Sequence, residues 1–162
     1  MISASTASAR REPELAGQTV VLIGGSAGIG LETARRARSE GAEVILTGRN
    51  PDRLKQAALE VGAQSTAAFD ASDPAAVQGF FQNLAGPIDH VLVTAGGPTY
   101  GPLLEMDAAQ VSEALSGHIV VALEVTRAAV GKMRPGGTLL FMGGTGGRRI
   151  APGVGIMSAA TD

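Results

Sequence analysis

The sequence contains no cysteine, few charged residues and no strong excess of either charge. Without cysteine the chain has no disulfide framework and no thiolate zinc site, and we predict no metal site. The absence of disulfides is typical of proteins in a reducing compartment, so we expect a cytoplasmic location. A net charge of −2 leaves no overall attraction to nucleic acid or to an anionic membrane surface. The first residues also lack a hydrophobic run long enough for a signal peptide or a membrane helix. We therefore expect no nucleic acid and no membrane as a partner.

Glycine and apolar residues, in contrast, are abundant. The 162 residues include 23 glycines, and 44% of the chain is hydrophobic, which is typical of a globular protein. The length suffices for one domain with a hydrophobic core and is short for two. Residues 1–14, which begin with a stretch rich in serine, alanine and threonine, are predicted to be a flexible leader, and residues 15–162 to form the domain.

Short apolar runs alternate along the chain with longer amphipathic stretches. The first run, Thr19–Ile23, is rich in β-branched residues, as in a strand buried on both faces of a sheet. Asn50 and Asp73, each followed by a proline, predict two helix starts. The repeated alternation predicts an α/β fold: a doubly wound parallel sheet with right-handed crossovers and helices on both faces. The predicted strands are Thr19–Ile23, 42–47, 65–70, 88–94 and 138–142, and the predicted helices are 31–40, Pro51–Val61, 74–84 and 108–133.

The first predicted strand leads into a glycine-rich turn, residues 24–30. Gly24 lets the chain turn sharply, Gly28 lets the backbone approach a pyrophosphate, and Gly30 allows the following helix to pack closely on the strand. The unpaired N–H groups and the positive end of that helix would face the phosphates. A glycine-rich turn without a ligand is the alternative, but its position after the first strand of an α/β chain favours dinucleotide binding.

The end of the second predicted strand discriminates between dinucleotides. A carboxylate there would bind the ribose 2′-hydroxyl of NAD and repel a 2′-phosphate. This chain has Gly48, which leaves space, and Arg49, whose planar guanidinium suits a phosphate. We therefore expect NADP(H) as the cofactor in preference to NAD(H). The alternative is that Arg49 is a solvated charge of the loop.

Four segments, in order along the chain, resemble those of a known family. They are Leu15-Ala16-Gly17-Gln18, the turn at 24–30, Phe69-Asp70-Ala71 and Val93-Thr94-Ala95-Gly96. Together they resemble the short-chain dehydrogenases/reductases, although a threonine before the turn and both asparagines of the last segment are replaced. The resemblance implies a Rossmann-type dinucleotide-binding domain over residues 15–162, in which Asp70 receives the adenine amino group. The residues implied to bind the cofactor are Gly24, Ser26, Ala27, Gly28, Ile29, Gly30, Arg49, Asp70, Ala71, Ala95 and Gly96.

The catalytic residues of this family are missing from the positions where the resemblance would place them. The serine position falls on Gly144, the tyrosine position on Met157 and the lysine position on Thr161. The asparagine position on the long helix falls on His118. The tyrosine would exchange a proton with the substrate oxygen, and the lysine would lower the pKa of the tyrosine. We therefore assign no catalytic residue.

Two other side chains are candidates for the missing proton donor. Tyr100 is the only tyrosine and follows the fourth predicted strand, at the sheet edge where ligands bind, but neither Lys55 nor Lys132 is placed to partner it. His118 is the better candidate, because imidazole exchanges protons near neutral pH. The alternative is that His118 is a core histidine hydrogen-bonded to the backbone.

The chain is shorter than is usual for this family, and it stops inside what would be the helix after the fifth strand. We expect a sheet truncated after that strand, with an exposed edge, in a domain incomplete at its carboxyl-terminal end. A truncated form, the ordered part of a longer product and a natural short form paired in a dimer all stay open. The wide apolar face of the 108–133 helix favours a homo-oligomer.

Three functions stay open at this stage. The resemblance implies a short-chain oxidoreductase that transfers hydride between NADP(H) and a carbonyl or alcohol, a small-molecule substrate that the sequence does not identify. The loss of the serine, tyrosine and lysine favours instead a catalytically inactive dinucleotide-binding protein, such as a sensor or a partner subunit. A fragment without independent activity is the third reading.

Overall fold

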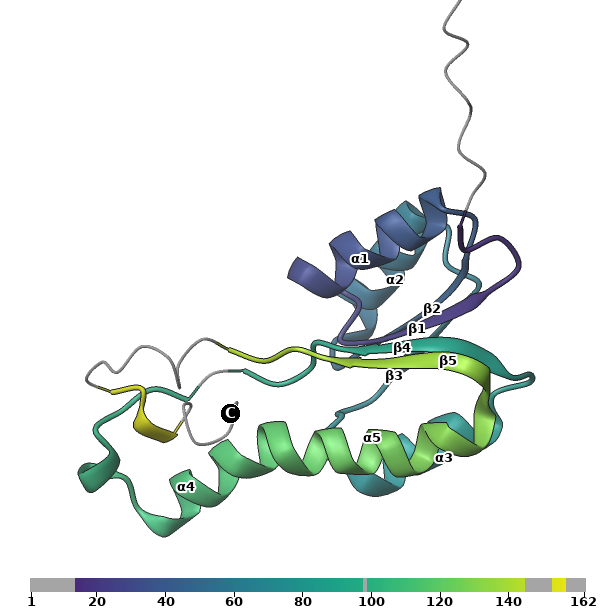
Figure 1. Ribbon diagram of the computed structural model, residues 1–162. Coiled ribbons are helices and arrows are strands. Elements are labelled where there is room, and N and C mark those ends of the chain that lie inside the picture. The colour runs from purple at the N-terminus through teal and green to yellow at the C-terminus, as the bar shows by residue number, and fades with distance from the viewer. Residues whose placement is uncertain (1–13, 98, 145–152, 157–162) are drawn as a thin grey trace, which may run out of the picture.

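The computed structural model describes residues 14–97, 99–144 and 153–156, which contain one five-stranded sheet (Figure 1). The strand order is β3-β2-β1-β4-β5, and every pair of neighbours is parallel. This order confirms the predicted doubly wound, Rossmann-type α/β fold. The strands are β1 Thr19–Ile23, β2 Glu43–Gly48, β3 Ser65–Ala68, β4 Ile88–Val93 and β5 Met133–Phe141.

Helices cover both faces of the sheet (Figure 1). On one face lie α1 (Gly28–Ser39) and α2 (Pro51–Val61), and on the other lie α3 (Pro74–Asn83) and α5 (Val121–Ala129). Between β4 and β5 the described chain also forms α4 (Ala108–Leu115) and three short helical turns, η1 (Leu103–Glu105), η2 (Ser116–Val120) and η3 (Val130–Lys132).

Each face of the sheet has its own hydrophobic cluster. Leu22, Leu46 and Leu54 belong to the cluster beneath α1 and α2. Ile23 and Phe81 belong to the cluster that α3 and α5 cover. Neighbouring residues of β1 therefore point into different clusters, which explains why this strand is apolar at nearly every position.

Residues next to the helix ends determine where α2 and α3 begin and where α2 ends. The side chain of Asn50 accepts a hydrogen bond from Arg53 N at 2.8 Å, and that of Asp73 accepts one from Ala75 N at 2.9 Å. Gly62 ends α2 with a φ of 69°, in the left-handed region that glycine adopts without strain. These contacts confirm the two helix starts predicted from an asparagine or aspartate before a proline.

The structure corrects several predicted boundaries. Helix α1 begins at Gly28 rather than at residue 31, so the helix starts inside the glycine turn. Strand β3 ends at Ala68 rather than at residue 70, because Ala68 pairs with Gly48, the last residue of its neighbour β2. Strand β5 begins at Met133 rather than at residue 138, because Met133 already pairs with Ile88 before an irregularity in the register.

The predicted 108–133 helix is continuous over Ala108–Lys132, but its winding changes. The π-helical turn η2 separates α4 from α5, which the sequence did not predict. By length and composition this is the one helix in the described parts of the chain that would suit a membrane span. Val121, Val125 and Ala129 are nevertheless buried in the hydrophobic cluster that they share with α3 and the sheet, as expected for a core helix. Figure 1 shows α5 lying beside α3 against this face of the sheet.

Within the described residues, β5 is an edge strand with an open outer side. Leu140 is 51% exposed and Phe141 is 42% exposed. The exposed edge expected from the sequence is therefore present in this part of the chain. Residues 1–13 of the predicted leader lie outside the described residues.

Candidate functional site

A cleft of about 1230 Å³ opens at the carboxyl ends of the parallel strands. Its walls include the turn after β1 and the loop after β4. Strands β1 and β4 are neighbours at the centre of the sheet. From these two strands the chain continues to opposite faces, to α1 in one case and towards α4 and α5 in the other (Figure 1). In open α/β sheets, ligands bind where the connections diverge in this way.

The turn after β1 forms one wall of the cleft and depends on glycine. Gly24 has a φ of 101°, and a Cβ there would lie 2.7 Å from Ala95 N, after the neighbouring strand β4. A Cβ on Gly30 would lie 2.7 Å from Thr94 Oγ1 and would also meet the Gly24 carbonyl. Only residues without a side chain allow β1, β4 and α1 to approach this closely.

Gly28 differs from these two glycines because it faces open space. Its φ is 54°, and a Cβ there would meet nothing within 4 Å. The preceding residue, Ala27, makes no side-chain capping bond, and the first turn of α1 has no acidic residue. Bare backbone, uncapped N–H groups and the positive end of the helix dipole together suit an anion such as a phosphate.

Thr94 joins the glycine turn to β4. Its hydroxyl donates to the Gly24 carbonyl at 3.0 Å, and its N–H donates to the Ile23 carbonyl at 2.8 Å. These bonds fix the distance between the two walls of the cleft. In the sequence Thr94 is only a departure from the family pattern, and its role depends on the pairing of β1 with β4.

Two arginines line the cleft near the end of β2. Arg49 follows the strand, and Arg53 lies in the first turn of α2. A Cβ on Gly48 would lie 2.9 Å from Ser26 Oγ, so the end of this strand passes close to the buried Ser26. Sequence reasoning missed Arg53; the signal that identifies it is its place in the first turn of the helix predicted to start after Asn50, directly after the strand that Arg49 follows.

Asp70 lines the same end of the cleft as an ionised acceptor. Its Oδ1 accepts hydrogen bonds from Ser72 N at 2.9 Å and from Ser72 Oγ at 2.8 Å. The backbone bond, followed by the hydroxyl bond, lowers the pKa of Asp70 below its ordinary value, and the positive charge of Arg49 lowers it further. Asp70 is therefore a carboxylate at neutral pH.

The opposite end of the cleft is lined by glycines and by the π turn. Gly96 has a φ of 104°, and a Cβ there would lie 2.6 Å from the Gly117 carbonyl, so the loop after β4 lies directly against η2. Gly143 and Gly144 follow β5 and also line the cleft. Gly144, where the resemblance expects serine, brings backbone to this wall and no hydroxyl.

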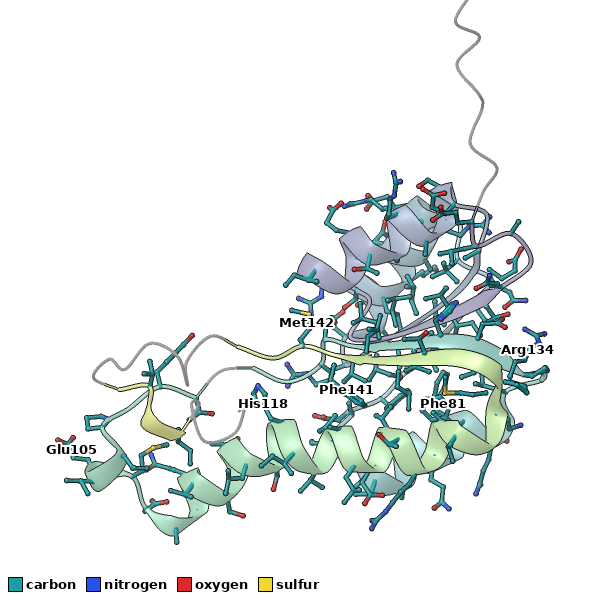
Figure 2. All side chains as sticks on the ribbon, in the orientation of Figure 1. Phe81, Glu105, His118, Arg134, Phe141 and Met142 are labelled. Atoms are coloured by element: carbon teal, nitrogen blue, oxygen red, sulfur yellow. The ribbon has the colours of Figure 1, made fainter. Side chains whose placement is uncertain are left out.

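His118 belongs to η2, lines the cleft and points towards the sheet (Figure 2). Its Nδ1 is buried and has no hydrogen-bond partner among the described residues. The structure therefore contains no hydrogen bond from this nitrogen to the backbone of the described residues, unlike the core histidine considered as the alternative.

Tyr100 and Glu113 line the cleft as well. Lys132 instead donates to two backbone carbonyls at the end of α3.

The structure brings together nearly all residues predicted to bind a cofactor. Gly30 is the exception, because it packs behind the turn rather than on the cleft wall. Met157 and Thr161, at the expected tyrosine and lysine positions, lie outside the described residues. The predicted residues that line the cleft are Gly24, Ser26, Ala27, Gly28, Ile29, Arg49, Asp70, Ala71, Ala95 and Gly96.

Comparison with known proteins gives matches over most of the chain. It is 34% identical over 136 residues to the cyclic-di-GMP-binding biofilm dispersal mediator protein of Escherichia coli strain K12, a match that covers 83% of this chain and 56% of that protein. Its fold matches a short-chain dehydrogenase/reductase from Serratia marcescens with a TM-score of 0.85 and 26% identity, over 91% of this chain and 64% of the other.

A second solved structure, BdcA in complex with NADPH, matches with a TM-score of 0.82 and 30% identity, over 91% of this chain and 60% of that one. The chain thus spans only part of the length of these relatives. The sequence model described as short chain dehydrogenase matches residues 18–160. This match covers the glycine turn, both ends of the cleft and all five strands, and the chain belongs to the short-chain dehydrogenase/reductase family of oxidoreductases.

Proposed function

We propose that the cleft binds NADP(H) and that the chain takes part in the interconversion of a carbonyl compound and an alcohol. The observation that carries this proposal is the bare backbone of Gly28 at the uncapped start of α1, in one cleft with Arg49 and Arg53. The first feature suits a pyrophosphate and the second suits a 2′-phosphate. The NADPH complex of BdcA, a related protein, supports the same cofactor.

Each part of the cleft would hold a different part of the cofactor. The N–H groups at the start of α1 bind the pyrophosphate, and the guanidinium groups of Arg49 and Arg53 bind the 2′-phosphate. The Asp70 carboxylate accepts a hydrogen bond from the adenine amino group. The glycines near η2 leave room for the nicotinamide, which when bound supplies or accepts the hydride.

A dinucleotide-binding protein without turnover is the second candidate. It is favoured by Gly144, which brings no hydroxyl to the cleft, and by Met157 and Thr161 in the sequence. Both candidates require cofactor binding, so they differ only in whether NADPH is consumed when ketones are added.

Calorimetric titration with NADPH and NADH tests the proposal. We expect NADPH to bind more tightly, and we expect Arg49→Gln to weaken NADPH binding by about tenfold or more, with little effect on NADH, because one charge-assisted bond to phosphate is lost. Arg127→Gln, which neutralises an exposed arginine on α5, is the matched control and should change neither affinity. No binding of either cofactor to the unaltered chain would refute the proposal. An unchanged affinity ratio in Arg49→Gln would refute the assignment of the 2′-phosphate to this residue.

A further inference from the structure

The imidazole of His118 has a polar atom for which the described structure provides no partner. Nδ1 is buried, and no described residue bonds to it. Most buried polar groups in proteins are hydrogen-bonded, because a buried group without a partner lowers stability. Such exceptions mark strained or functional positions. Because Nδ1 itself is buried, a ligand in the cleft that His118 lines would have to bond to the other ring nitrogen, Nε2.

The backbone around His118 is also irregular. The π turn η2 interrupts an otherwise α-helical segment, and such turns occur frequently at functional sites. Glu113, Gly117, His118 and Val121, from before, within and after this turn, all line the cleft. The Cε1 atom of His118 would be 4.0 Å from a Cβ on Gly96, which places the ring beside the loop after β4.

Few other groups near His118 are able to exchange a proton. Among the described residues that line the cleft, Glu113 comes from the same helical segment and Tyr100 from the loop after β4, and both are exposed to water. Arg49, Arg53 and Asp70 belong to the other end. The described lining residues after β5 and at 153–156 contribute no titratable side chain. His118 is the titratable group at this end that is partly withdrawn from water.

We propose that His118 binds the oxygen of a carbonyl or alcohol substrate and exchanges a proton with it. This inference rests on the proposed function, which puts the nicotinamide at the same end of the cleft. In a reduction, the coenzyme when bound would supply a hydride to the carbonyl carbon, and Nε2 of the His118 imidazolium would give its proton to the carbonyl oxygen. The imidazolium becomes neutral imidazole, which water protonates again. Oxidation of an alcohol reverses these transfers.

The ring signals of the two histidines provide a test that does not depend on turnover. His90 is the internal control, because its Nε2 lies 2.5 Å from Gln18 Oε1 at the amino ends of the strands, far from the cleft. Imidazole ¹⁵N signals would be followed across a pH series, without and with saturating NADP⁺. We expect NADP⁺ to move the His118 ring signals and to leave those of His90 unchanged. Signals of His118 that stay in place when NADP⁺ is bound would overturn the proposal.

Two matched variants test the proton transfer itself. NADPH consumption would be measured with cyclohexanone, acetophenone and ethyl acetoacetate. We expect His118→Asn to slow reduction by about a hundredfold or more, and His90→Asn to leave it unchanged. Both variants should bind NADPH with affinities within about threefold of the unaltered chain, which shows that they are folded. His118→Gln serves as a second variant if His118→Asn does not fold.

The outcomes separate this inference from the proposed function. If the unaltered chain binds NADPH but reduces none of the three ketones, or if the His118 variant retains full activity, the role of His118 is wrong while cofactor binding stands. If NADPH does not bind, both proposals fail.

Discussion

The cleft contains residues that act through a side chain and residues that act through the lack of one. Gly24 and Gly96 are required because a Cβ at either position would meet backbone atoms of neighbouring segments closer than real Cβ contacts allow. Arg49 and Asp70 act through charge, and the two charges support each other. Substitutions of the first kind should therefore alter the fold of the turn, whereas substitutions of the second kind should alter affinity and pH dependence.

Asp70 gives the chain a pH-dependent contribution to stability. Since the Ser72 hydrogen bonds lower the pKa of Asp70 in the folded state, folding favours its ionised form. This contribution is complete above the unfolded-state pKa, about 3.9, and is lost as the pH falls through the lower folded-state value. We expect Asp70→Asn to unfold at a lower urea concentration than the unaltered chain at neutral pH, and this difference to shrink in strong acid. Equal differences at both pH values would contradict this reasoning.

The helices and strands show what local sequence is able to predict. The capped starts at Asn50 and Asp73 depend on neighbouring residues only, and the alternation of strands and helices led to the parallel sheet. The π turn was not predictable, because it is associated with a contact between Gly96 and Gly117 that joins two separate segments. The early start of β5 likewise depends on pairing with β4.

The residues of the candidate site also fall into those that local sequence predicts and those that depend on tertiary contacts. The glycine turn and Arg49 were recognised from the sequence because each adjoins a single predicted strand. Thr94 required knowledge that β1 and β4 are neighbours, since its hydroxyl bonds to the turn of the other strand. The buried, unpartnered nitrogen of His118 was also beyond sequence reasoning, because burial depends on the packing of the loop after β4.

Gly28 at the start of α1 allows the anion-binding role of this helix to be tested. Its φ of 54° strains any other residue, and the methyl group of Gly28→Ala would enter the open space where we place the pyrophosphate. We expect this variant to lose about 1–2 kcal/mol of stability and about tenfold or more in NADPH affinity, measured by urea unfolding and calorimetry. Gly79→Ala is the control, because its Cβ would meet nothing within 4 Å in the interior of α3. That variant should gain roughly 0.5–1 kcal/mol and bind NADPH normally. Normal NADPH binding by Gly28→Ala would contradict the placement.

Taken as a whole, the described molecule is covered on both faces of its sheet but open at β5. Leu140 and Phe141 of this strand and Met142 beyond it are all more than two-fifths exposed. An apolar edge strand with unpaired backbone groups is a template for pairing with another chain. The predicted homo-oligomer would therefore have a physical basis at this edge, as well as on the long helix.

This expectation leads to a solution measurement. We expect the chain to self-associate in sedimentation velocity experiments over a concentration series, and we expect Leu140→Lys to reduce the association, because a lysine on an edge strand opposes strand pairing. Leu59→Lys, at a leucine that is 71% exposed on α2, is the matched control and should have no effect. A monomeric unaltered chain, or equal effects of the two variants, would contradict a role of the β5 edge.

The function proposed for the cleft depends first on the backbone of the glycine turn, which we expect to bind the pyrophosphate of NADP(H). The most direct test is to follow the backbone amide signals of the chain by NMR while NADPH is added. We predict saturable movement of the signals of Gly28 and Ile29 at the start of α1, together with that of Gly96 across the cleft, while the signal of Gly62 at the far end of α2 stays in place. Unchanged signals of Gly28 and Ile29 at saturating NADPH, or movement confined to other parts of the chain, would contradict it.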